Sequence, residues 1–237
     1  MKILITGVSG FIGFSLADKL LKLGYNVVGL DNNNSYYSPK FKKKRLKEIA
    51  KYKNFKFLKI DISNKKQLMI ISKYKFDYIF HFAAQPGVRY SLVNPSIYYS
   101  TNIIGFQNLF EIINFKKIKK VFYASSSSVY GEQKKFPIDE SSKLNAKNPY
   151  GMSKIINENL AEILSFKHSV PFIGLRLFTV YGEWGRPDMF ILKLLNYLNK
   201  KKIFKLNNSG NHYRDFTYIG DVVEVCCKLI KKKFRIG

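Results

Sequence analysis

The stretch KILITGVSGFIGFSLADKLLKL, residues 2–23, joins a short apolar run to an apolar pattern of helical spacing through glycines at every third position. Such glycines allow a tight turn and close approach of the backbone to a pyrophosphate, while the helix N-terminus faces the phosphate charge. A plain turn before a helix could carry the same glycines, but the strand before them and the helix after them are the context that a dinucleotide-binding motif requires. We therefore predict a cofactor site at Gly7, Gly10, Phe11, Ile12 and Gly13.

The rest of the chain alternates short apolar runs with longer segments of helical spacing. The runs are apolar on both faces, as strands of a covered parallel sheet should be, and they span residues 2–6, 25–30, 55–60, 77–82, 120–124 and 170–178. Helical spacing is clearest in residues 11–23, 94–113 and 153–166. This alternation predicts an α/β fold of Rossmann type, a doubly wound parallel sheet with helices on both faces.

The formal net charge of +25 over 237 residues raises nucleic-acid binding as a hypothesis, because a basic face releases counterions from phosphates. The lysines, however, stand in scattered short runs such as KFKKKRLK and FKKIKK. Arginine interleaved with aromatic residues along one groove, which is typical of nucleic-acid binding, is absent from the sequence. We expect a solvated, lysine-rich surface that attracts an anionic substrate, and no nucleic-acid partner.

Targeting and metal-binding signals are also absent from the sequence. The opening MKILITG is too short for a signal peptide, and no apolar run approaches the roughly 20 residues that span a bilayer. Cys226 and Cys227 are adjacent, which suits neither an ordinary disulfide nor a metal site. We expect a cytoplasmic protein without membrane insertion and without a bound metal.

The ends of the next predicted strands carry further candidate cofactor contacts. Asp31 closes the second strand, at about the distance from the glycines expected of the carboxylate that binds the adenosine ribose diol. A carboxylate there repels a 2′-phosphate, so NAD is favoured over NADP. Asp61 and Ile62 follow the third strand and could reach the adenine, although a plain turn aspartate fits the pattern equally well. Mostly small residues follow the fourth strand and leave room for a cofactor: Phe82, Ala83, Ala84 and Gln85.

Four consecutive serines, residues 125–128, follow the fifth predicted strand and therefore lie at the carboxyl end of the sheet, where ligands bind in such folds. Tyr150 and Lys154 are four residues apart at the start of a predicted helix, hence on one face. An ammonium beside a phenol stabilises the phenolate, so we expect the Tyr150 pKa to fall toward neutrality and Tyr150 to act as a general base. A lone Y-x-x-x-K means little, but together with the serines and the glycine motif it predicts a catalytic group.

These motifs together resemble the extended short-chain dehydrogenase/reductase superfamily, and more narrowly its nucleotide-sugar epimerases. HFAAQPGVRYSLVNP, YASSSSVYGE, LRLFTVYGEWGRPDM and RDFTYIGDVV closely resemble stretches of UDP-glucuronate 4-epimerases, and the resemblance covers essentially the whole chain. It implies an NAD-binding Rossmann domain over residues 1–178 and a partial substrate-binding region over residues 179–237 that includes elements returning to the first domain. It also implies cofactor contacts at Asn102, Ser125 and Phe178.

The resemblance separates this chain from sister enzymes of different chemistry. Sugar 4,6-dehydratases carry an Asp-Glu pair, and UDP-glucuronate decarboxylases one glutamate, where this chain has Ser127 and Ser128. Without those carboxylates, the resemblance leaves oxidation and re-reduction at one sugar carbon as the reaction, and a 4-epimerase requires only these two steps. By resemblance, Tyr150 takes the proton of the sugar C4 hydroxyl, Ser126 hydrogen-bonds the same oxygen, and Lys154 tunes Tyr150 and holds the nicotinamide ribose.

A uronate is the substrate that the resemblance favours. Ser127, Ser128 and Thr179, with Arg186 near them, are similar to the residues that receive the C6 carboxylate in uronate-specific members. Small hydroxyls and one guanidinium can satisfy a carboxylate in a closed site. The alternative is that the serines merely cap the strand end.

Other arginines fall inside the matching stretches. Arg214 matches the phosphate-binding arginine of the family and Arg89 a sugar or phosphate contact, with surface ion pairs as the alternative for both. Arg176, inside the sixth predicted strand, is expected to form a buried structural pair. The full set of predicted substrate-binding residues is Val88, Arg89, Ser127, Ser128, Thr179, Arg186, Met189 and Arg214.

Several alternatives stay open at this stage. Family members continue beyond the point where this chain stops, so we expect a truncated substrate lobe, and a catalytically inactive NAD-binding module is one alternative. UDP-glucose/UDP-galactose 4-epimerisation is the other. Family members usually form homodimers through two helices, for which residues 94–113 and 153–166 are the candidates, although their apolar faces could equally belong to the core.

Overall fold

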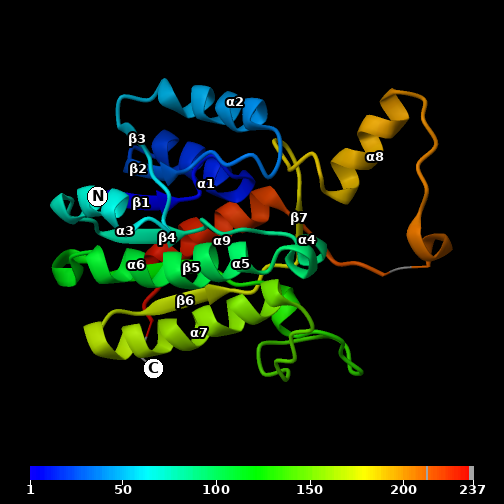
Figure 1. Cartoon of the computed structure of the whole chain (residues 1–237). Helices are drawn as coiled ribbons and strands as arrows, with labels where there is room; N and C mark the ends of the chain where they lie inside the picture. Colours follow the sequence, from blue (N-terminus) through cyan, green and yellow to red (C-terminus); the bar gives the residue numbers. More distant parts are fainter. Residues whose placement is uncertain (212, 235–237) are drawn as a thin grey trace.

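The computed structural model describes residues 1–211 and 213–234, and its centre is a six-stranded parallel sheet in the order β3-β2-β1-β4-β5-β6 (Figure 1). The order reverses between β1 and β4, which creates a crevice at the carboxyl ends of these two strands. The predicted doubly wound parallel fold is confirmed. The strands are β1 Lys2–Thr6, β2 Asn26–Asp31, β3 Phe55–Lys59, β4 Tyr78–His81, β5 Lys120–Ala124 and β6 Phe172–Leu175.

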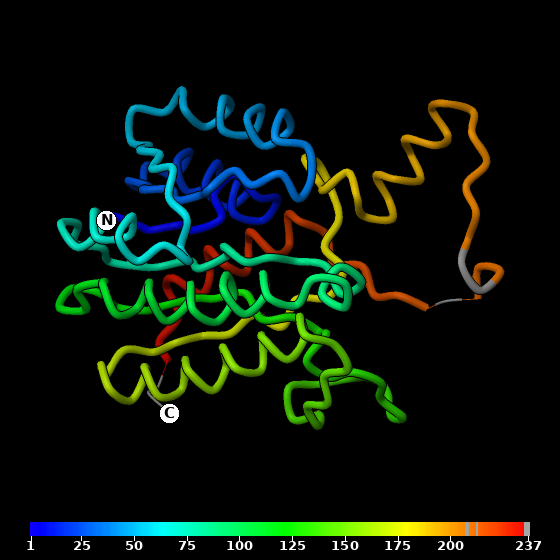
Figure 2. Tube along the Cα trace, in the orientation of Figure 1, coloured from blue at the N-terminus to red at the C-terminus, as the bar shows by residue number. Residues whose placement is uncertain are grey.

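Two helical layers cover the sheet because successive strand residues point to opposite faces. In β1, Ile3 and Ile5 pack with α1 Phe11–Lys22, α2 Pro39–Ala50 and α9 Ile219–Lys231, and Leu4 packs with the other layer. That other layer contains α3 Lys65–Leu68, α6 Gly105–Ile112 and α7 Pro149–His168. Figure 2 shows that the last helix, α9, lies beside the first helix, α1, although the two are at opposite ends of the sequence.

The outer strands depart from prediction. None of the residues of β3 and none of those of β6 is fully buried, so the expectation of coverage on both faces is wrong for these two. The reason is their position, since an edge strand has one neighbour and only part of its faces lies under helices. β6 is also shorter than the apolar run 170–178, because the chain leaves the sheet after Leu175 and turns toward the second sheet.

The helical pattern of residues 94–113 is not one regular helix. The chain forms α4 Val88–Val93, α5 Ser96–Tyr98, a π-helical segment Tyr99–Ile104 and then α6. The wide π turn brings the buried Asn102 amide against the segment that follows β4, where Asn102 Oδ1 accepts from Gln85 N at 2.7 Å. The extra residue of the π-helical turn thus places the Asn102 side chain in the interior, which regular helical spacing does not predict.

The helix α7 carries the Tyr-Lys pair and starts earlier than predicted. Asn148 caps it, with Oδ1 accepting from Gly151 N at 2.8 Å, and Pro149 occupies the first turn. The helix ends at Ser169, which has a φ of 52°. Because the cap fixes the first turn, Tyr150 is held on a rigid helix end.

A second, two-stranded sheet follows β6. β7 Thr179–Tyr181 and β8 Phe216–Tyr218 pair in parallel, and α8 Phe190–Asn199 projects away from the main body (Figure 1). The predicted substrate region, 179–237, includes residues 212 and 235–237, which lie outside the described residues. Short 3₁₀ segments complete the chain at Met69–Lys73, Phe115–Lys117, Ser127–Val129 and Asn207–Gly210.

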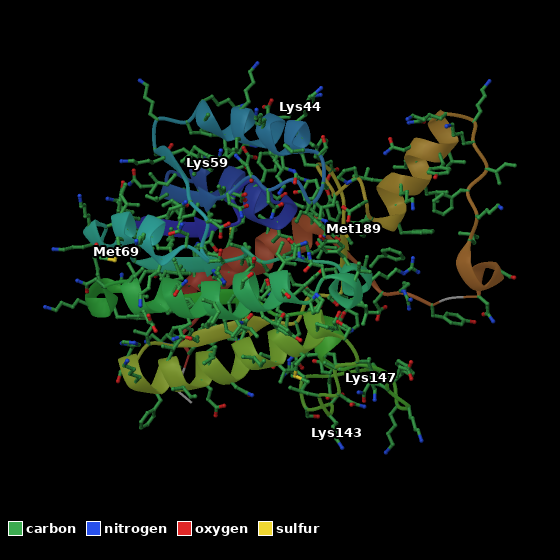
Figure 3. The ribbon with its side chains drawn as sticks, in the orientation of Figure 1. Lys44, Lys59, Met69, Lys143, Lys147 and Met189 are labelled. Atoms are coloured by element: carbon green, nitrogen blue, oxygen red, sulfur yellow. The ribbon has the colours of Figure 1, made fainter. Side chains whose placement is uncertain are left out.

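The lysines lie mostly on the surface, as expected. In Figure 3, Lys44, Lys59, Lys143 and Lys147 extend away from the ribbon, and all four are exposed. Over the described ranges, no helix is both long and apolar enough to cross a bilayer. The same residues contain no group of histidine, cysteine, aspartate or glutamate side chains that could hold a metal ion.

Candidate functional site

A cavity of about 450 Å³ opens across the carboxyl ends of the central strands. It gathers residues from the glycine turn, from the ends of β2, β4 and β5, from the first turn of α7 and from the start of β7. Most predicted site residues line it: Gly7, Gly10, Phe11, Ile12, Gly13, Asp31, Ile62, Phe82, Ala83, Ala84, Val88, Ser125, Ser126, Ser127, Ser128, Tyr150, Lys154, Phe178, Thr179, Arg186 and Met189. One cavity thus contains the predicted cofactor, catalytic and sugar positions.

Three predicted cofactor contacts support the cavity wall and do not line it. Asn102 and Gln85 are buried and bonded to each other's polar groups, and Asn102 Nδ2 also donates to Ser153 Oγ at 2.9 Å. Asp61 holds its own turn, accepting from Ser63 Oγ at 2.6 Å and from Asn32 Nδ2 at 2.9 Å. Burial alone would raise the Asp61 pKa, but these hydrogen bonds outweigh it and lower the pKa.

Two predicted substrate arginines also lie elsewhere. Arg89 is exposed on α4, and Arg214 is exposed on the segment that leads to β8, where Nη1 donates to Tyr213 O at 3.1 Å. Neither lines the cavity. By contrast, the predicted structural pair of Arg176 is confirmed, because Nε and Nη2 bond the two carboxylate oxygens of Glu158 at 3.0 and 2.9 Å.

The glycine turn is shaped for close backbone approach. Gly7 has a φ of +72°, and a Cβ built on it would lie 2.7 Å from Ala83 N. A Cβ on Gly13 would lie 2.2 Å from Gly7 O, so helix α1 packs against the turn at a distance that only glycine permits. In this turn the Ser9 hydroxyl is buried without a hydrogen-bond partner among the described residues. Such an orphan polar atom fits a turn built to face a polar ligand.

The Asp31 carboxylate is anchored at the end of β2. Its Oδ2 accepts from Ser9 N at 3.1 Å and its Oδ1 from Asn33 N at 2.8 Å. The carboxylate therefore lies between the glycine turn and the cavity, where it can accept hydrogen bonds from a ribose diol. The turn, its orphan hydroxyl and this carboxylate together fit NAD, with Asp31 on the adenosine ribose and residues 7–13 on the pyrophosphate.

The candidate catalytic group is assembled from two elements. Lys154 Nζ donates to Ala124 O at 2.8 Å, which ties α7 to the end of β5. Lys154 Nζ also lies 5.9 Å from the Tyr150 ring centroid. Ser126 Oγ accepts from Ser128 N at 3.2 Å and is hydrogen-bonded to the Tyr150 side chain. A hydroxyl, a phenol and a buried amine thus meet in one wall of the cavity.

The pKa of Tyr150 differs from prediction. Burial raises it above its ordinary value of 10, while the Ser126 hydrogen bond and the positive charge of Arg186 act to lower it. The expectation that this pKa falls toward neutrality is wrong, because desolvation of the phenolate outweighs these two effects. The Lys154 ammonium donates to Ala124 O. Burial also lowers the Lys154 pKa to about 8, although the Glu158 carboxylate partly opposes this.

The lowered pKa of Lys154 predicts a pH dependence of stability. The ordinary pKa of a lysine is 10.5, so the folded protein holds this proton less tightly than the unfolded chain does. The resulting gain in unfolding free energy is complete above about pH 10.5 and is lost as pH falls through 8. Relative to Lys154→Met, the wild type should gain up to about 3 kcal/mol of unfolding free energy between pH 7 and the alkaline end of this window. Urea denaturation of both proteins across this range measures the difference, with Lys53→Met, at an exposed lysine, as control. A difference that does not change with pH would contradict the assignment.

Residues of α2 and of the segment before it were missed. Tyr36, Tyr37 and Lys42 line the cavity, and Lys42 and Arg45 are buried. The sequence alone predicts solvated surface for the run KFKKKRLK, which contains Lys42 and Arg45. That interpretation is wrong for these two residues. The signal lay in spacing, because Lys42, Arg45 and Ile49 recur at intervals of three and four residues, which places them on one buried helix face.

Arg186 is held at the cavity by an ion pair. Its Nε and Nη2 bond the Asp188 carboxylate at 3.1 and 2.5 Å, and its guanidinium lies 5.5 Å from the Tyr36 ring centroid and 5.8 Å from that of Tyr37. Burial would lower the Arg186 pKa, but the Asp188 partner outweighs it and raises the pKa. The Arg186 guanidinium, held by Asp188, therefore lines the cavity as a cation.

Comparison with known proteins gives consistent results. The NAD dependent epimerase/dehydratase family matches residues 3–237. Protein CapI of Staphylococcus aureus is 43% identical over 234 residues, covering 98% of this chain and 70% of that protein. The UDP-glucuronate 4-epimerase of Thermodesulfobacterium geofontis is 40% identical over 221 residues, covering 92% of this chain and 68% of that protein.

A solved structure agrees over the whole chain. UDP-glucuronic acid 4-epimerase from Bacillus cereus, in complex with UDP-glucuronic acid and NAD, is similar with a TM-score of 0.92 and 34% identity. The match covers 100% of this chain and 75% of that one. The resemblance drawn from the glycine turn, the serines and the Tyr-Lys pair is thereby confirmed. The chain belongs to the NAD dependent epimerase/dehydratase family.

Proposed function

We propose that this chain is an NAD-dependent 4-epimerase of a UDP-sugar, and that its substrate is UDP-glucuronate, which it converts to UDP-galacturonate. One observation carries the proposal: Ser126, Tyr150 and Lys154 share a cavity with the glycine turn. The resemblance adds that Ser127 and Ser128 replace the carboxylates of dehydratases and decarboxylases. The relatives and the B. cereus structure support the same reaction class.

In the proposed reaction, Tyr150 in its phenolate form accepts the proton of the sugar C4 hydroxyl, and Ser126 hydrogen-bonds the same oxygen. NAD⁺, when bound, supplies the reversible hydride acceptor and a positively charged ring. Lys154, fixed by Ala124 O, holds Tyr150 in place and keeps a donor on the ribose side of the phenol. The resulting 4-keto sugar turns over in the cavity, C4 takes the hydride back on its other face, and Tyr150 returns the proton. The cycle has no net oxidation.

The sugar end of the cavity favours an acidic substrate. Ser127, Ser128 and Thr179 contribute hydroxyls, and Arg186 contributes a charge. Among the described residues that line the cavity, Asp31 is the one carboxylate, and it belongs to the glycine-turn end. A C6 carboxylate would therefore meet hydrogen-bond donors and a cation without a competing acid, apart from Asp188, which Arg186 already holds.

Substrate competition tests the choice of sugar. We expect kcat/KM for UDP-glucuronate to exceed that for UDP-glucose. Because hydrogen bonds to a charged group contribute about 1.5–3 kcal/mol each, Ser127→Ala with Ser128→Ala should lower that ratio by a factor of about 10 or more. Ser141→Ala, in an exposed turn, should leave it unchanged. A wild-type preference for UDP-glucose would instead favour the UDP-glucose/UDP-galactose 4-epimerase, and NAD binding without any turnover would favour an inactive module.

We further propose a cytoplasmic enzyme with an NAD-binding unit over residues 1–178, a substrate unit over residues 179–237, and homodimer formation through the outer faces of the π-helical segment and α7. Free thiols at Cys226 and Cys227 agree with a reducing compartment. Ile104 and Ile163 expose 48% and 63% of their surfaces on those outer faces, and such apolar exposure is typical of an interface. Sedimentation equilibrium that finds only monomer would contradict the dimer.

A further inference from the structure

Arg45 on α2 lies outside the cavity and is completely buried, with 0% of its surface exposed. Its guanidinium bonds groups from three segments that are distant in the sequence. Nη1 donates to Ser9 O at 2.9 Å and to Tyr37 Oη at 2.6 Å, Nε to Trp184 O at 3.1 Å, and Nη2 to Gly185 O at 3.1 Å and to Trp184 O. One side chain therefore joins the glycine turn, a cavity-lining tyrosine segment and the loop after β7.

That loop has a conformation that requires support. Trp184 has a φ of 60°, in the left-handed region that non-glycine residues seldom adopt, so the surroundings must stabilise it. Its ring packs on Phe14 and Phe41, with centroids 5.3 and 5.8 Å apart. Its carbonyl and that of Gly185 point toward Arg45. The very next residue is Arg186, whose guanidinium lines the cavity.

Arg45 also supports the other side of Arg186. Tyr37, which accepts a hydrogen bond from Arg45, has its ring centroid 5.8 Å from the Arg186 guanidinium. Arg186 is thus fixed from its backbone through residues 184–185 and from its side-chain face through Tyr37, and Arg45 bonds both. Lysine could not replace this arrangement, because one ammonium cannot present the planar fork that reaches carbonyls on opposite sides.

We propose that Arg45 is a positioning residue that locks the loop of residues 182–186 to the glycine turn and thereby sets where Arg186 presents its charge to the sugar end of the cavity. Arg45 makes no contact with the reacting atoms in this assignment, and it acts through Arg186. The expected effect of Arg45 on substrate binding rests on the proposed function, whereas its expected effect on the position of the loop of residues 182–186 does not. The alternative is a buried arginine that stabilises the fold and has no specific effect on Arg186.

Trp184 makes the loop position directly measurable, because it is the single tryptophan of the chain. In Arg45→Lys and Arg45→Met we expect acrylamide to quench Trp184 fluorescence more strongly than in the wild type, with far-UV circular dichroism unchanged. Arg176→Lys, which alters another partly buried arginine away from this loop, is the matched control and should match the wild type. Wild-type quenching in folded Arg45→Lys would overturn the proposal, and so would failure of both Arg45 variants to fold.

A double-mutant cycle tests the link to Arg186. By calorimetry, Arg45→Lys should weaken UDP-glucuronate binding roughly tenfold, and should have little further effect in an Arg186→Met background, because residues coupled through shared partners are non-additive. Losses that simply multiply would overturn the proposal, since a purely stabilising residue gives that result. If the wild type fails to bind UDP-glucuronate, the proposed function fails, while the Trp184 quenching experiment still decides the role of Arg45.

Discussion

Tyr150→Phe should lower the rate of epimerisation by roughly a thousandfold or more while leaving the fold and NAD affinity near those of the wild type. In the proposed reaction the Tyr150 phenol oxygen accepts and returns the proton of the C4 hydroxyl, and positioned acid–base groups contribute factors of about 10² to 10⁴. Phenylalanine keeps the ring that packs on Tyr98 at a centroid distance of 6.0 Å, so packing should change little. Only the hydroxyl hydrogen-bonded to Ser126 is lost.

The measurement is single-turnover formation of UDP-galacturonate from UDP-glucuronate, with NAD affinity measured in parallel by calorimetry. Tyr74→Phe is the matched control, because Tyr74 stacks on Phe76 at 5.8 Å away from the cavity. It should retain the wild-type rate. A Tyr150→Phe rate within tenfold of the wild type would mean that another group moves the proton, and the assignment of Tyr150 as the base would be wrong.

Gly13→Ala should weaken NAD binding by about a hundredfold or more. The added Cβ would lie 2.2 Å from Gly7 O, 2.9 Å from Gly7 C and 3.2 Å from Val8 Cα, all of which are backbone atoms. Because no flexible side chain can give way, either α1 or the glycine turn must move. A shift of about 1 Å at a backbone that cradles a pyrophosphate removes several hydrogen bonds at once, and each is a charge-assisted bond of about 1.5–3 kcal/mol.

Gly24→Ala separates this steric effect from glycine's conformational role. Gly24 has a φ of +80° but nothing within 4 Å of the added Cβ. That variant should lose about 1 kcal/mol of stability and bind NAD as the wild type does. Titration of NAD into each purified variant measures both effects. Equal NAD affinity in Gly13→Ala and Gly24→Ala would show that the close packing of α1 on the turn does not shape the cofactor site.

Local signals were sufficient to predict the sheet and the helix that carries Tyr150 and Lys154. Each predicted strand overlaps an observed one, because a buried parallel strand needs a continuous apolar run whatever its neighbours are. The glycine turn was likewise predictable, since its close contacts with Ala83 and within residues 7–13 allow no side chain. Tyr150 and Lys154 could be paired because one helical turn separates them.

The rest depended on contacts between distant segments. Arg45 bonds carbonyls 139 and 140 residues away, so its helical spacing with Lys42 and Ile49 could indicate a buried face but not the groups that bind its guanidinium. The pKa of Tyr150 depends on how deeply the phenol is buried and on the positions of Ser126 and Arg186, which lie in other segments of the chain. Arg89 and Arg214 lie within motifs that match the family, yet their side chains are exposed away from the cavity.

The most direct test of the central claim is incubation of the chain with UDP-glucuronate and NAD, followed by anion-exchange separation of the sugar nucleotides and measurement of NADH. We expect that UDP-galacturonate appears, that the two epimers approach equilibrium from either side, and that no net NADH accumulates. Accumulation of NADH in proportion to consumed UDP-glucuronate would contradict this expectation, because the enzyme would then be an NAD-dependent dehydrogenase of the sugar. Binding of both NAD and UDP-glucuronate without any interconversion would contradict it equally.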